Sequence, residues 1–166
     1  RNNGWTFTME EAYFGTLIAA ANDPGVRAIV VTGAGRSFCP GLDLKVLETS
    51  AKQGDAGGGY RRLPMTTARL IPKPVIGAIN GACAGIGFIQ MASCDIVFAS
   101  TAAKFTTAFA RRGLPAENSL SWLLPRLVGT ANAMDLLLSA RVVPADEAKE
   151  IGLVSKVLEP EELLPA

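Results

Sequence analysis

The segment from Lys73 to Asp95 constrains the fold more than any other part of the chain. It predicts a buried strand over Val75 to Ile79, a turn at Asn80-Gly81 and a helix that opens near Gly85. Because this helix carries almost no charge before Asp95, we expect it to be buried on all sides. A buried helix after a glycine-rich bend presents free backbone N–H groups at its start. Such groups can hold a phosphate, or the oxygen of a thioester that becomes an enolate.

Helical and strand patterns alternate along the rest of the chain. The segment Thr8-Met9-Glu10-Glu11 predicts a capping box with Thr8 as N-cap, and Asn22 to Gly25 should end the helix that follows. Further strands are expected over 28–31, 96–99 and 153–158, and further helices over 63–71, 119–128, 131–139 and 144–151. A helical turn is expected over 44–48 and a mobile, exposed segment over 50–60, whereas the pattern over 105–112 is ambiguous. The alternation predicts an α/β domain with a largely parallel sheet.

Composition excludes several classes of function. The 166 residues suit a single domain, 1–166, and a hydrophobic content of 49% with 19% charged residues leaves apolar surface for a subunit interface. A net charge of +1 gives no reason to expect binding to nucleic acid or to an acidic membrane surface. No apolar run is long enough to span a membrane, and no signal peptide opens the chain.

Histidine is absent and cysteine is scarce. The lack of histidine excludes Ser-His and Cys-His catalysis and most zinc sites. Three cysteines, Cys39, Cys83 and Cys94, are odd in number and lack the spacing of metal ligands. We therefore expect reduced thiols in a cytoplasmic protein, with no metal site.

A glycine-rich loop follows the strand predicted over 28–31, but it does not match the known phosphate-binding loops. Gly33 and Gly35 fit the first two glycines of a dinucleotide loop, yet Phe38 stands at the third glycine position and no helical pattern follows at once. A Walker loop is excluded because the chain has no Gly-Lys pair. This loop therefore needs another explanation.

Several separated motifs, taken in chain order, resemble the enoyl-CoA hydratase/isomerase (crotonase) family. The resemblance extends over most of the chain from about Trp5 and rests on 38–45, 73–96, 124–129, 145–148 and 152–154. It implies a spiral of ββα units that forms trimers, often paired as hexamers. It also implies acyl-CoA as substrate, with coenzyme A part of the substrate and no separate cofactor. Relative to the family pattern, the chain starts after the first hairpin and ends before the C-terminal helices.

The same resemblance implies roles for particular residues. The backbone N–H groups of Leu42 and Ile86 would hold the enolate oxygen, and Gly85 opens the second of these loops. Gly41 and Asp43 flank the first donor and are expected to contact substrate, while Lys45 matches a position that holds the CoA phosphates. The alternatives are that Leu42 and Ile86 are simply packed apolar residues and that Lys45 is an exposed lysine of a helical turn.

The chain departs from the family where hydratases carry two glutamates that hold the attacking water. Ile89 and Phe109 occupy these positions, so water addition by the usual pair is implausible and both residues become lining of the acyl site. Glu117 resembles the carboxylate that moves the proton in Δ3,Δ2-enoyl-CoA isomerases. The alternative for Glu117 is a simple interaction with the dipole of the helix that follows. Arg111 and Arg112 are expected to be solvated or interface residues.

These residues favour an isomerase-type enzyme acting through a thioester enolate. Glu117 would remove a proton at C2 and return it at C4, and a site formed with Phe109, Leu114 and Trp122 would raise its pKa by desolvation. A second hypothesis is a CoA-binding or structural homologue without turnover. A third is thioester hydrolysis or dehalogenation with Glu117 as the nucleophile.

Overall fold

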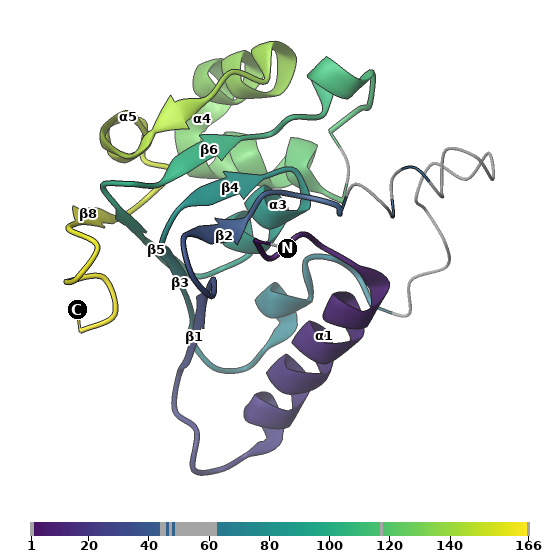
Figure 1. The fold of residues 1–166 in the computed structure, drawn as a ribbon, viewed down its shortest axis with the longest axis vertical. Helices are drawn as coiled ribbons and strands as arrows, with labels where there is room; N and C mark the ends of the chain where they lie inside the picture. Colours follow the sequence, from purple (N-terminus) through teal and green to yellow (C-terminus); the bar gives the residue numbers. More distant parts are fainter. Residues whose placement is uncertain (1, 44–45, 47, 49–62, 117, 166) are drawn as a thin grey trace.

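Two four-stranded sheets form the centre of the protein (Figure 1). The structure is a computed structural model that describes residues 2–43, 46, 48, 63–116 and 118–165. The first sheet has the order β1-β3-β5-β8 and the second has the order β2-β4-β6-β7. The strands are β1 (Ile29–Thr32), β2 (Ser37–Cys39), β3 (Val75–Ile79), β4 (Ala82–Ala84), β5 (Ile96–Ser100), β6 (Lys104–Thr106), β7 (Val143–Pro144) and β8 (Lys156–Leu158).

From β1 to β6, successive strands alternate between the two sheets. Each of the pairs β1–β2, β3–β4 and β5–β6 places its first strand in one sheet and its second strand in the other. All sheet neighbours are parallel except β6 and β7, which are antiparallel. The predicted α/β architecture with parallel strands in a repeated ββα arrangement is therefore confirmed. The prediction of one sheet was wrong, because strands of three residues such as β2, β4 and β6 are too short to show a periodic pattern.

The central segment has the predicted form. β3 covers Val75–Ile79, and α3 (Ile86–Ala92) has all seven residues buried. The turn residue Asn80 also explains the glycine-rich loop after β1. Its Nδ2 donates hydrogen bonds to the carbonyl oxygens of Gly33 (2.9 Å) and Gly35 (2.8 Å), and its Oδ1 accepts one from the Gly33 N–H at 3.1 Å. The loop therefore serves to join β1 and β3.

Several predicted boundaries need correction. Helix α1 (Phe7–Asn22) begins two residues earlier than expected, and its N-cap is Thr6, whose Oγ1 accepts a hydrogen bond from the Met9 N–H at 3.1 Å. Thr8 therefore lies inside the helix, and Glu10 instead accepts a hydrogen bond from Trp5 Nε1 at 2.9 Å. The helix predicted over 63–71 is only a short 3-10 turn, η1 (Thr67–Leu70). The turn expected over 44–48 falls partly, and the segment over 50–60 wholly, outside the described residues.

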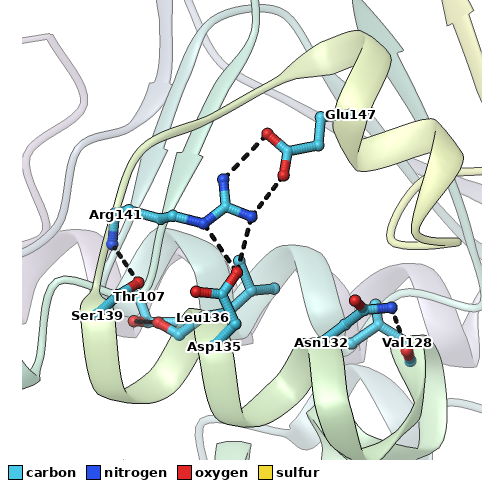
Figure 2. Close-up of polar contacts among 8 residues, drawn as sticks. All are labelled: Thr107, Val128, Asn132, Asp135, Leu136, Ser139, Arg141 and Glu147. Atoms are coloured by element: carbon cyan, nitrogen blue, oxygen red, sulfur yellow. Dashed lines mark hydrogen bonds and ion pairs between the residues drawn. The ribbon is translucent and has the colours of Figure 1, made fainter.

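Helix α4 (Leu120–Ser139) anchors the second sheet. Gly129 lies inside it with φ 77° and ψ 162°, so the predicted break between two helices is present as a kink. Thr107 Oγ1 donates a hydrogen bond to the Leu136 carbonyl oxygen at 2.8 Å, and Arg141 binds both Asp135 of α4 and Glu147 of α5 (Ala145–Glu150) (Figure 2). The Thr107 bond fixes the segment after β6 against α4, and Arg141 joins α4 to α5.

Candidate active site

The loop after β2 positions the first predicted donor. Gly41 has φ 108°, a backbone conformation that glycine adopts readily and other residues rarely do. An isolated parallel β-bridge joins Trp5 to Leu42. The Trp5 N–H donates to the Gly41 carbonyl oxygen at 2.7 Å, and the Asp43 N–H donates to the Trp5 carbonyl oxygen at 2.9 Å. Because successive N–H groups of an extended chain point to opposite sides, these bonds turn the N–H of Leu42 away from Trp5.

The bend before α3 positions the second predicted donor. Gly85 has φ 52° and ψ −115°, and its N–H donates to the Thr106 carbonyl oxygen of β6 at 3.2 Å. Its own carbonyl oxygen accepts from the Ile89 N–H at 3.1 Å, the first bond of the helix. Ile86 is the first helical residue, and the N–H groups of a first helical turn have no acceptor within their own helix.

Glycines bring the two loops together. A Cβ atom on Gly85 would lie 3.9 Å from the Cα atom of Gly41. A Cβ atom on Gly87 would lie 2.1 Å from the carbonyl oxygen of Cys39, so only glycine permits α3 to approach the end of β2 this closely. The structure therefore places the two predicted donor segments side by side.

A cavity of about 70 Å³ lies between the two loops. Its described lining combines both loops with the segment after β6 and consists of Pro40, Gly41, Leu42, Gly85, Ile86, Ala108, Phe109, Arg112 and Leu114. This volume is far below the roughly 300–1,000 Å³ of a complete small-molecule site. The cavity can therefore enclose only a small part of an acyl-CoA.

Two threonines hold the third wall of the cavity. Thr106 Oγ1 donates a hydrogen bond to the Ala140 carbonyl oxygen at 2.9 Å and accepts one from the Ala108 N–H at 3.2 Å. Together with the bond of Thr107 to α4, these contacts fix Ala108, whose φ is 61°, and the following Phe109. The short turn η2 (Ala110–Arg112) then ends at Gly113, with φ 68°.

The structure unites most of the predicted site residues but not all of them. Gly41, Leu42, Gly85, Ile86 and Phe109 line the same cavity. Asp43 adjoins it and supports the first loop through its backbone N–H. Ile89 is fully buried inside α3 and is not part of the described lining.

Two predicted residues, Lys45 and Glu117, lie outside the described residues. The expected neighbours of the Glu117 carboxylate are only partly brought together. Phe109 and Leu114 line the cavity, whereas Trp122 is 52% exposed and lines a different hollow, with Arg126 stacked 3.9 Å above its ring. The predicted contact of Trp122 with the Glu117 carboxylate stays a prediction, because Glu117 lies outside the described residues.

Sequence reasoning missed the place of Arg112. Both Arg111 and Arg112 are exposed, as expected, but Arg112 also lines the cavity. The motifs around Leu42 and Ile86, which identified the site, gave no reason to expect a positively charged side chain in its wall. The signal available in the sequence was its position three residues after Phe109, at the end of the loop that carries the third wall.

The cysteines offer no nucleophile. All three are free and buried, and burial raises the pKa of each thiol, that of Cys94 to about 12. Neutral thiols in an apolar interior react slowly, so Cys39, although next to the first loop, acts as a packed side chain. Among the described residues no group of three or more His, Cys, Asp or Glu residues could hold a metal ion. No helix in the described part of the chain is both long and apolar enough to cross a membrane.

Comparison with known proteins assigns the family. A family model described as Enoyl-CoA hydratase/isomerase matches residues 2–166. The chain belongs to the enoyl-CoA hydratase/isomerase family. Within it, the chain is 36% identical to 1,2-epoxyphenylacetyl-CoA isomerase of Escherichia coli over 168 residues, with 98% of this chain and 64% of that protein covered. It is 38% identical to the peroxisomal Δ(3,5)-Δ(2,4)-dienoyl-CoA isomerase of Arabidopsis thaliana, with 85% of this chain and 55% of that protein covered.

A solved structure of the enoyl-CoA hydratase/isomerase family confirms the fold. A crystal structure of an enoyl-CoA hydratase from Mycobacterium marinum aligns with a TM-score of 0.82 and 43% identity, covering 99% of this chain and 73% of that chain. The relatives therefore bear names of both hydratases and isomerases. The chain spans less than two thirds of the length of the two isomerases it matches.

Proposed function

We propose that this chain is the core of an acyl-CoA isomerase, which moves a carbon–carbon double bond through a thioester enolate. The N–H groups of Leu42 and Ile86 hold the thioester oxygen as it gains negative charge. The observation that carries this proposal is that the loops of both residues line one small cavity. Two preorganised N–H donors aimed at one oxygen are the usual means of stabilising such an oxyanion.

A single carboxylate transfers the proton between two carbon atoms of the substrate. In this proposal Glu117 removes a proton at C2 and returns it at C4, so that no bound water is needed. Its role rests on the sequence resemblance, and the apolar residues Ile89 and Phe109 at the hydratase glutamate positions support a reaction without water addition. Lys45 contacts the CoA phosphates, and coenzyme A enters only as part of the substrate.

The variant Glu117→Gln tests this proposal. It keeps the size of the side chain and removes the base, so turnover of a 3-enoyl-CoA should fall by roughly 10²–10⁴-fold. Affinity for the acyl-CoA should hardly change, because the oxygen-binding donors are backbone groups. Glu150→Gln, on the exposed side of α5, is the matched control and should keep full activity. Full activity of Glu117→Gln would refute the proton transfer by this carboxylate.

The same assays separate the alternative functions. Tight acyl-CoA binding without turnover of any 2-enoyl- or 3-enoyl-CoA by the wild type would indicate a binding homologue. A covalent acyl adduct on Glu117, detected by mass spectrometry after incubation with acyl-CoAs, would indicate a hydrolase or dehalogenase mechanism with a carboxylate nucleophile. Either result would replace the isomerase proposal.

A further inference from the structure

Arg112 is the charged residue in the described lining of the cavity between Leu42 and Ile86. Its position is fixed by the turn η2, in which its backbone N–H donates to the Phe109 carbonyl oxygen at 2.9 Å. The side chain is exposed and still borders the cavity, so it stands at the rim.

No ion pair or side-chain hydrogen bond is recorded for Arg112 within the described residues. Two other arginines of the structure differ. Arg141 is bound by Asp135 and Glu147, and Arg126 lies over the ring of Trp122. A guanidinium is always charged and offers five N–H donors in a plane, a geometry that matches a carboxylate or a phosphate. At the rim of an otherwise apolar cavity, Arg112 therefore offers an unused site for an anionic oxygen.

We propose that Arg112 selects acyl groups that carry a second carboxylate, by binding that carboxylate at the rim of the cavity. This inference rests on the proposed function, in which the thioester oxygen lies between Leu42 and Ile86. The cavity holds only about 70 Å³, so a short acyl chain starting there brings its far end to the rim. The apolar residues Phe109 and Leu114 contact the methylene groups, and Arg112 pairs with the terminal charge.

The phosphates of coenzyme A have the same chemistry as a carboxylate, so the experiment must distinguish the two. We suggest measuring by calorimetry the affinity of adipoyl-CoA, hexanoyl-CoA and free coenzyme A for the wild type and for Arg112→Leu, Arg112→Lys and Arg111→Leu. The two acyl groups have the same chain length and differ in the terminal carboxylate. Both are saturated, so their binding does not depend on turnover.

Arg112→Leu is expected to lower the affinity for adipoyl-CoA selectively. The wild type should bind adipoyl-CoA more tightly than hexanoyl-CoA, and Arg112→Leu should weaken adipoyl-CoA binding about tenfold to a hundredfold, the usual value of a charge-assisted hydrogen bond. Hexanoyl-CoA and free coenzyme A should change little. Arg112→Lys should retain part of the preference, and Arg111→Leu, which changes an exposed neighbour outside the described lining, should retain all of it.

Two results would overturn the inference and leave the proposed function standing. If Arg112→Leu lowered the affinity for all three ligands equally, the guanidinium would be assigned to the CoA phosphates. No change in any affinity would show that Arg112 is only solvated. Failure of the wild type to bind any of the acyl-CoAs would refute both proposals. An unchanged melting temperature of Arg112→Leu serves as the check that the variant is folded.

Discussion

Gly87 packs directly against Cys39, since a Cβ atom at position 87 would lie 2.1 Å from the Cys39 carbonyl oxygen and 2.8 Å from its Cβ atom. This contact joins the first turn of α3 to the end of β2, the two elements from which Ile86 and Leu42 extend. The carbonyl oxygen belongs to the backbone and the Cβ atom is bonded directly to it, so neither can turn aside as the end of a flexible side chain would. The separation of the two predicted donors therefore depends on a residue that has no side chain.

Gly87→Ala should destabilise the protein. The added methyl group must push α3 away from β2, and overpacking of this kind lowers the free energy of unfolding by about 1–3 kcal/mol or more. Acyl-CoA affinity should fall with it, because the two donor loops move apart. Chemical denaturation and calorimetry measure the two effects.

Gly15→Ala is the matched control for that experiment. Gly15 lies in α1 with nothing within 4 Å of an added Cβ atom. The change should raise the free energy of unfolding by about 0.5–1 kcal/mol, since alanine loses less backbone entropy in a helix. Similar stability of the two variants would contradict the close contact of Gly87.

The Arg141 ion pairs predict a pH-dependent contribution to stability. Hydrogen bonds to Arg141 lower the pKa of Asp135 and of Glu147 from their ordinary values of 3.8 and 4.5. Because the pKa values are lower in the folded protein, the ion pairs stabilise the fold at pH values above the ordinary pKa values. This stabilisation is lost as the pH falls through the lowered pKa values of the folded state. Arg141→Met should therefore lower the melting temperature slightly at pH 7, and the difference from the wild type should shrink as the pH falls toward 2.

Salt provides the control for this prediction. The Asp135 carboxylate is exposed and that of Glu147 is partly exposed, so added salt should screen the pairs and reduce the difference between Arg141→Met and the wild type at pH 7. A difference that persists unchanged at pH 2 would mean that Arg141 acts through packing of its side-chain methylenes.

The sequence predicted the buried centre of the fold better than its short strands. Val75–Ile79 is an apolar run after Pro74, and Ile86–Ala92, after Gly85, holds no charged residue and a single polar one, Gln90, so burial of both was expected. Thr6 was missed as N-cap because Thr8 with Glu11 offered a matching capping box. The N-cap residue Thr6 directly follows Trp5, which the bridge to Leu42 holds in place. This is a contact between segments distant in the sequence.

The candidate site was predictable where it consists of backbone. The positions of Leu42 and Ile86 follow from glycines and a motif, and the structure brings their loops together. The roles of Arg112 and Trp122 depend on which way long side chains point from short turns, and no periodic pattern in the sequence records that direction. The place of Arg112 was therefore found only from the described lining of the cavity, which does not include Trp122.

Assembly into a trimer, or a pair of trimers, is the third prediction. Met134 and Leu138 are four residues apart on the same face of α4 and are 52% and 68% exposed. Together with Val142, at 50%, they leave apolar surface that a second copy of the chain can cover. Sedimentation at micromolar concentration should give a mass of about three chains or a multiple.

A lysine at this surface tests the assembly. Leu138→Lys should shift the sedimenting species toward the monomer, because association would bury an unpaired charge. Thr16→Lys, on the exposed side of α1, should leave the wild-type state intact. A well-folded monomer of the wild type would refute the assembly and favour a self-contained binding module.

The last prediction concerns hydration of a conjugated thioester. Hydratases hold the attacking water between two carboxylates, and the positions of both are apolar and buried here, with Ile89 at 0% and Phe109 at 6% exposure. Without a general base near the β-carbon, the protein should hydrate crotonyl-CoA far more slowly than it isomerises a 3-enoyl-CoA. The loss of absorbance of the conjugated thioester measures the first reaction, and its appearance from a 3-enoyl-CoA measures the second. Fast hydration that survives Glu117→Gln would show that another group activates the water, and that the assignment of Ile89 and Phe109 to the glutamate positions is wrong.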